Sequence, residues 1–173
     1  MKKKQKVDVM VGFTYILVGT LYLLFPMYHI NNIKILNIII FSIIAIVSLI
    51  QFILNINSKD YTGLYSFLAC IVFVICMFVM NVNKPRLLSL AILIWIMLMS
   101  LIKLKRSDYY HDKRDRMWKL NVLMLCIFIL SGILTSINLF YDRDVQVIVI
   151  GFFLFINGIL ETMDPVVKYL VSR

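Results

Sequence analysis

Charged residues, glycine, proline and cysteine are all scarce in this sequence of 173 residues. Charged side chains make up 16% of the chain, and it holds only 6 glycines, 3 prolines and 3 cysteines. A typical soluble domain is about 25% charged and about 45–50% apolar. Here hydrophobic residues reach 62% and the mean hydropathy is +0.92. That excess is too large for one soluble core, so the solvent around most side chains must itself be apolar.

The cysteines and the missing motifs exclude several kinds of chemistry. Cys70, Cys76 and Cys126 all lie inside apolar runs, and their odd number gives no disulfide framework and no Cys/His ligand set. The sequence also lacks a Ser/His/Asp order, GxSxG, HExxH and a phosphate-binding glycine loop. We therefore predict no catalytic residue, no bound cofactor and no metal, and we predict that the protein is not an enzyme.

Six apolar runs dominate the chain, at residues 9–25, 33–54, 61–80, 87–104, 120–140 and 145–160. A helix of about 20 residues spans the hydrocarbon core of a bilayer. The runs are apolar on all sides instead of alternating, and lipid requires backbone groups to be paired within the segment, so helices are favoured over strands. The sequence predicts an all-α fold: one polytopic membrane helix bundle of about six transmembrane helices over residues 1–173.

The basic residues between these runs predict the orientation. The formal charge of +9 would suggest nucleic acid as a partner of a soluble protein, but here the positive charges flank membrane spans, so no nucleic-acid partner is expected. With the N-terminus in the cytoplasm, 14 Lys and Arg residues lie on the cytoplasmic side and 4 on the other, namely Lys34, Lys84, Arg86 and Arg143. This asymmetry predicts cytoplasmic N- and C-termini in the cell membrane.

The spans also pair into three hairpins, at about residues 9–56, 61–104 and 118–163. Near the end of each second helix, a small residue precedes a polar one by three positions, in the pairs Ser48/Gln51, Ser100/Lys103 and Gly158/Glu161. A repeat would place Gln51, Lys103 and Glu161 at one depth, as a possible intramembrane polar cluster, and predicts an ion pair between Lys103 and Glu161. The alternative is that six apolar helices resemble one another by composition alone.

Two segments resemble a known family. The stretch from Gly12 through Gly19 to Pro26 is similar to the glycine-spaced helix that opens the hairpins of HdeD-like membrane proteins, and the stretch from Gly151 through Gly158 to Glu161 is similar to the second helix of such a hairpin. The resemblance implies a short-repeat protein with six spans, linked to bacterial acid resistance and without an agreed biochemical activity.

Small residues recur along three of the spans. A spacing of seven places two residues on one helix face, and a small-xxx-small pair lets two helices approach closely in lipid. We predict helix-packing faces at Gly12, Gly19, Gly132, Ser136, Gly151 and Gly158. Such faces also allow association with a second copy or with another membrane protein.

The segment of about residues 105–117 is predicted to be a basic cytoplasmic loop. Asp108, His111, Asp112 and Asp115 would share a helix face, but they lack the second His of helical metal sites, so a solvated loop is favoured. Binding to anionic lipid headgroups is expected for its basic residues and their neighbour, namely Lys105, Arg106, Lys113, Arg114, Arg116 and Lys119.

Three classes of function fit these observations. The first is a small non-enzymatic membrane protein of the stress-tolerance or accessory type. The second is a small-solute transporter or the membrane-embedded substrate-binding subunit of one, for which a midplane cavity lined by Asn37, Asn121 or Asn157 would be expected. The third is an immunity-type protein that protects against a membrane-active toxin.

Overall fold

The computed structural model describes residues 3–28, 32–56, 61–80, 84–112 and 117–171. Its helices are α1 (Lys3–Leu24), α2 (Ile33–Asn55), α3 (Thr62–Val79), α4 (Pro85–Asp112), α5 (Met117–Asn138) and α6 (Arg143–Val171), and a short 3-10 helix, η1 (Phe25–Tyr28), follows α1. All six α-helices are long and apolar enough to cross a membrane. The described residues contain no strand. The predicted all-α bundle of a multi-pass membrane protein is confirmed.

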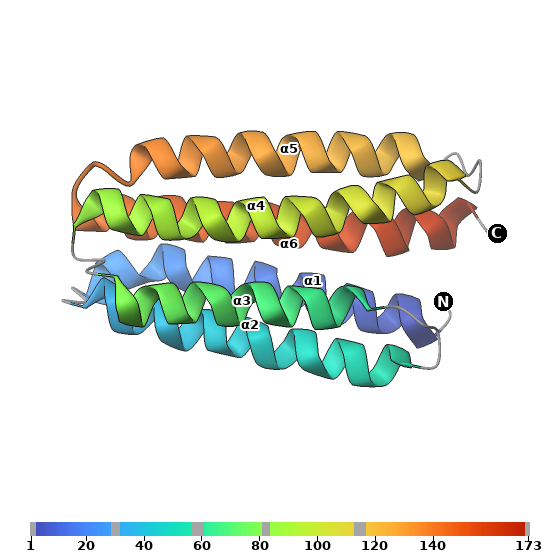
Figure 1. Cartoon of the computed structure of the whole chain (residues 1–173), viewed down its shortest axis with the longest axis horizontal. Coiled ribbons are helices and arrows are strands. Elements are labelled where there is room, and N and C mark those ends of the chain that lie inside the picture. The colour runs from blue at the N-terminus through green and yellow to red at the C-terminus, as the bar shows by residue number, and fades with distance from the viewer. Residues whose placement is uncertain (1–2, 29–31, 57–60, 81–83, 113–116, 172–173) are drawn as a thin grey trace.

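The six helices lie side by side in two layers, with α1, α2 and α3 in one and α4, α5 and α6 in the other (Figure 1). Both termini are at the same end of the bundle, which we call the termini end; the opposite end is the far end. Each helix packs on its neighbours in the chain, and α6 packs on α1 to close a ring. The pairs α2/α3, α4/α5 and α6/α1 pack more extensively than α1/α2, α3/α4 and α5/α6. The two helices of each predicted hairpin are thus the less extensively packed pairs, and the extensive contacts lie between successive hairpins.

Three helices run well beyond the spans predicted from the sequence, the first being α1, which begins at Lys3 instead of at residue 9. Helix α4 continues past residue 104 to Asp112, so the segment predicted as a basic loop is helical up to that residue, and residues 113–116 lie outside the described part. Helix α6 continues past residue 160 to Val171 and includes Pro165. The predicted span of α4 ended after Lys103 and that of α6 ended before Glu161. Several of the charged side chains that follow find partners on the other helix, and the backbone stays helical.

The backbones of α1 and α6 approach each other closely at four glycines. A Cβ on Gly19 would lie 2.5 Å from the backbone nitrogen of Phe155 and 2.8 Å from the carbonyl oxygen of Gly151, and a Cβ on Gly158 would lie 2.8 Å from the carbonyl oxygen of Gly12. Gly12 therefore faces Gly158 and Gly19 faces Gly151. A step of seven residues toward the C-terminus of α1 matches a step of seven residues toward the N-terminus of α6. Two antiparallel helices that stay in contact along their length require this equal spacing.

The predicted pair on α5 contacts α4 instead. A Cβ on Gly132 would lie 2.8 Å from Cδ1 of Ile96, and the hydroxyl oxygens of Ser136 and Ser89 are 2.5 Å apart. The space left by the missing side chain of Gly132 is filled by the side chain of Ile96 on α4. The space beside Gly19 and Gly158 is filled by the backbone of the opposite helix.

An aromatic cluster fills the middle of the ring. The buried Trp95 of α4 has its ring centroid 5.1 Å from that of Phe41, 6.3 Å from Phe128 and 5.9 Å from Phe153. Phe73 stacks on Phe41 at 3.9 Å. The cluster brings together side chains of α2, α3, α4, α5 and α6.

Candidate functional site in the bundle interior

Side chains of α4 and α6 form a ladder of ion pairs at the termini end. Lys103 pairs with Glu161, and Arg106 contacts both Glu161, at 3.4 Å, and Asp164. One turn further, the ammonium of Lys168 donates a hydrogen bond to the hydroxyl of Tyr110. The same ammonium lies 2.6 Å from a carboxylate oxygen of Asp164. Partners across the two helices are 58 residues apart at each step. The constant separation follows because α4 and α6 run parallel and in step.

The carboxylates of this ladder are removed from water. The side chain of Asp164 is 1% exposed, that of Glu161 18% and that of Lys103 14%. Asn121 of α5 donates a hydrogen bond to Asp164 at 3.3 Å. Burying a charge is unfavourable unless it is paired and hydrogen-bonded, so the cations and the amide together permit these acids to lie inside the bundle.

A third acid is buried on the other side of the ring. Asp8 of α1 is 8% exposed and accepts hydrogen bonds from Gln51 at 2.8 Å and from Asn55 at 3.4 Å. Both donors lie on α2, so the carboxylate links the first two helices. We call the set of polar residues at this end the polar compartment; its members are Asp8, Gln51, Asn55, Lys103, Arg106, Asn121, Glu161 and Asp164.

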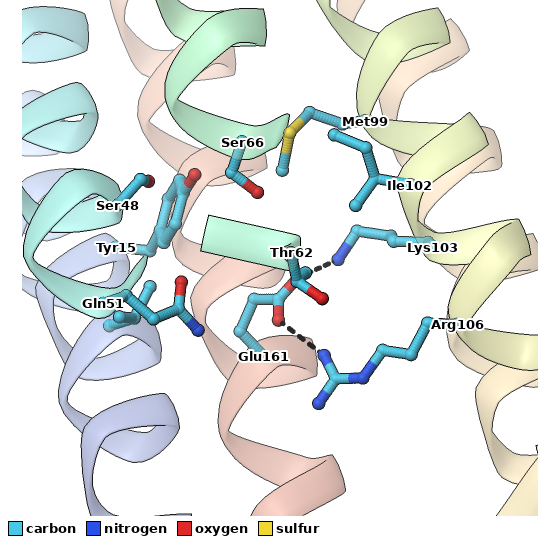
Figure 2. Close-up of a pocket in the computed structure, with 11 residues that line it drawn as sticks. Tyr15, Ser48, Gln51, Thr62, Ser66, Met99, Ile102, Lys103, Arg106 and Glu161 are labelled. Atoms are coloured by element: carbon cyan, nitrogen blue, oxygen red, sulfur yellow. Dashed lines mark hydrogen bonds and ion pairs between the residues drawn. The ribbon is translucent and has the colours of Figure 1, made fainter. Parts of the chain in front are cut away.

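Two small cavities lie within the polar compartment. In Figure 2, Glu161 points toward Lys103 and Arg106, and Gln51 approaches the same space from the opposite side. This cavity has a volume of about 20 Å³, which is room for about one water molecule. The second, also about 20 Å³, is lined by Asn121 and Asp164 among others. The three polar residues at matching hairpin positions thus line one cavity, and the ion pair predicted between Lys103 and Glu161 is present.

A row of buried polar side chains continues from the polar compartment toward the far end. Asn157 lies one helical turn, about 6 Å, beyond Glu161 on α6 and is fully buried. Tyr15 is 2% exposed, and Tyr22, about 10 Å further along α1, donates a hydrogen bond of 2.5 Å to the buried Asn37. We call these four residues the interior row: Asn157, Tyr15, Tyr22 and Asn37.

Several atoms of the interior row lack a protein partner. Within residues 3–171, leaving out the undescribed gaps, no hydrogen-bond partner reaches the hydroxyl of Tyr15, Nδ2 of Asn37 or either amide atom of Asn157. Buried polar groups in proteins are nearly always paired, with ordered water where protein groups do not reach. The interior row therefore offers polar atoms that ordered water can pair.

The residues predicted to meet lipid headgroups divide into three groups. Arg106 was wrongly predicted: it points into the bundle, because it lies three residues after Lys103 on the same helix face and finds the acids of α6 there. Lys105 and Lys119 are exposed. Lys113, Arg114 and Arg116 lie outside the described residues. So does Asp115, one of the four residues considered from the sequence as a metal-binding helix face. The described part of the chain contains no group of three His, Cys, Asp or Glu side chains that could hold a metal ion.

The buried positions of Asp8 and Asp164 were not predicted from the sequence. A usable pattern was present, because Lys103, Arg106 and Tyr110 have the same spacing of three and four residues as Glu161, Asp164 and Lys168. The first two residues of one set are basic and the first two of the other are acidic. Such a match between two parallel spans indicates that these two helix faces contact each other.

Comparison with protein-family models, with curated proteins and with solved structures finds no match to the chain. The resemblance to HdeD-like proteins therefore stays a prediction based on residues 12–26 and 151–161.

Proposed function

We propose that this multi-pass membrane protein conducts protons through its interior, along the polar compartment and the interior row. The observation that supports this is the placement of ionisable side chains inside the bundle. Three of only nine acidic residues, Asp8, Glu161 and Asp164, are buried or nearly so. Ionisable side chains within membrane spans are rare and commonly belong to proton or ion pathways.

The dimensions of the interior favour protons over a larger solute. The cavities of the polar compartment each hold about one water molecule, and the aromatic cluster around Trp95 occupies the middle of the ring. A proton needs only a chain of hydrogen-bonding groups. The hydroxyl of Tyr15 can both donate and accept, and the amide of Asn157 can hold water in place.

This proposal belongs to the transport class among the three functions considered from the sequence. The cavity that Asn121 lines lies in the polar compartment at the termini end and not at the midplane, and Asn37 and Asn157 are fully buried. Neither a stress-tolerance role nor an immunity role gains a structural observation of its own. We retain the proposals that the membrane is the cell membrane and that both termini are cytoplasmic, on the strength of the basic residues at the termini end.

Proton flux into vesicles tests the proposal. The full chain is reconstituted with a pH-sensitive dye inside, and a potassium gradient with valinomycin supplies the driving potential. We expect flux well above that of empty vesicles, and a reduction of about tenfold or more in Asn157→Leu, which breaks the interior row. The matched control is Asn138→Leu, because Asn138 lies at the end of α5 and bonds only to its own helix among the described residues.

The outcome is interpretable because Asn157→Leu should still fold. Replacing buried polar atoms without partners by an apolar group of similar size is close to neutral or stabilising. Wild-type flux equal to that of empty vesicles would refute the proposal. So would a folded Asn157→Leu variant that conducts as well as the wild type.

A further inference from the structure

We propose that the groove between α3 and α4 binds one phospholipid with a zwitterionic headgroup that carries a primary amine. The groove has a volume of about 500 Å³, within the range of small-molecule sites. It is separate from the polar compartment, and the inference does not depend on proton handling. The argument rests on its shape, its depth and two charges at one end.

The walls of the groove are apolar over most of their length. Helix α3 contributes one face, at intervals of three and four residues, and α4 contributes a run of leucines and isoleucine; together these residues are Leu68, Ala69, Val72, Leu98, Leu101, Ile102 and Leu104. Leu68 and Leu101 are each about half exposed. The packing of α3 on α4 is less extensive than that of α2 on α3, and in Figure 1 the two helices diverge toward the termini end. The groove lies where α3 and α4 do not pack fully against each other.

The depth of the groove matches one leaflet of a bilayer. From Leu98 to Asp108 it follows ten residues of α4, about 15 Å. The hydrocarbon core of a bilayer is about 30 Å thick, so one leaflet is about 15 Å. The whole groove, with its polar end, thus has the depth of one leaflet, and its apolar part from Leu98 to Leu104 is about 9 Å long. It can hold part of an acyl chain that enters from the termini end.

Polar side chains are present only at the termini end of the groove. Tyr65, Lys105 and Asp108 line this end, and the ammonium of Lys105 lies 5.7 Å from the ring centroid of Tyr65. Lys105 and Asp108 are exposed and lie one turn apart on α4. No ion pair to Asp108 occurs within the described residues.

This pair of charges complements a zwitterionic headgroup. The ammonium of Lys105 can bind a phosphate, and the carboxylate of Asp108 can accept hydrogen bonds from a primary ammonium. A choline headgroup has no N–H to donate, and a glycerol headgroup has no cation. The site should therefore prefer phosphatidylethanolamine over phosphatidylcholine and phosphatidylglycerol with the same acyl chains.

Native mass spectrometry of the full chain in detergent, titrated with each of these three lipids, tests the assignment. We expect one retained phosphatidylethanolamine with about tenfold preference, the factor expected for one charge-assisted hydrogen bond. Asp108→Asn should remove the preference over the other two lipids, and Lys105→Gln should weaken binding of all phospholipids. Lys119→Gln and Asp144→Asn serve as matched charge controls, because both residues are exposed and neither lines the groove.

A second variant tests the acyl part. Val72→Phe fills the deep end of the groove and should lower lipid retention, whereas Leu130→Phe, an exposed position on α5, should not. Equal retention of the three lipids, or retention unchanged by Asp108→Asn and Val72→Phe, would overturn the proposal. A dimer that Val72→Phe abolishes would also overturn it, because the occupant would then be a second copy of the chain.

Discussion

Gly12 and Gly158 face each other across the α1/α6 contact, and a Cβ on Gly158 would lie 2.6 Å from the backbone nitrogen of Ile16. No rotation of a side chain relieves such a contact, because the obstructing atoms belong to the opposite helix backbone. The two helices would have to separate. This contact closes the ring of helices, so its integrity bears on the whole bundle.

We expect Gly158→Ala to lower the free energy of unfolding by about 1–3 kcal/mol, the usual result of overpacking. Gly132→Ala should have a smaller effect, since its Cβ would meet only the flexible side chain of Ile96. Thermal unfolding of the purified protein in detergent compares the two variants. Equal losses would show that the backbone contact between α1 and α6 is not specially close.

The ladder between α4 and α6 predicts an asymmetry between its two sides. Glu161→Gln leaves both Lys103 and Arg106 without this carboxylate, whereas Lys103→Gln leaves Glu161 paired with Arg106. Removing one partner of a buried pair is destabilising by up to about 3–5 kcal/mol. We expect a larger drop in melting temperature for Glu161→Gln.

Exchanging the charges should restore only part of this loss. In the double variant Lys103→Glu with Glu161→Lys, the ion pair between the two positions can form again, but the exchanged lysine faces Arg106. Melting temperatures of the two single variants and the double variant form a double-mutant cycle. Complete rescue would indicate that the contact from Arg106 to Glu161 has little energetic weight.

The orientation prediction can be checked by cysteine labelling in cells that express the chain. On a background with Cys70, Cys76 and Cys126 replaced, a single cysteine is introduced at the exposed Lys105 or Tyr141. With cytoplasmic termini, an impermeant maleimide should label Tyr141→Cys in intact cells and Lys105→Cys only after lysis. The opposite pattern would invert the assignment.

Trp95 is expected to be the most sensitive single position of the core. Trp95→Ala should destabilise the bundle by roughly 3 kcal/mol, toward the lower end of values for large core truncations, because lipid already solvates apolar groups and the lost packing dominates. Trp118→Ala is the control, since Trp118 is half-buried near His111. Similar effects at both positions would argue against the aromatic cluster as the centre of packing.

The fold was readable from the sequence because long apolar runs leave a chain few options in lipid. The ends of the helices were not. Hydropathy treats Arg106 and Glu161 as interruptions, although Arg106 pairs with the acids of α6. Pro165 resembles a helix end, although α6 continues through it.

The residues of the polar compartment could be predicted only where their spacing along the helices followed the hairpin pattern. Gln51, Lys103 and Glu161 were found through the hairpin positions, and all three line one cavity. Asp8 was not predicted because it follows a run of N-terminal lysines, and such a charged segment is usually exposed to solvent. Arg106 was assigned to lipid because its direction depends on the helix continuing beyond residue 104, which the hydropathy of the run does not reveal.

The α1/α6 contact also constrains how the protein is made. The ribosome completes α1 before it begins α6, more than a hundred residues later. Until then the glycine face of α1 has lipid in place of its partner, and Lys103 and Arg106 are in the membrane without their acids. Ring closure therefore cannot precede the synthesis of α6. A nascent chain halted before α6 would present both an open helix face and unneutralised charge to the cell's membrane quality control.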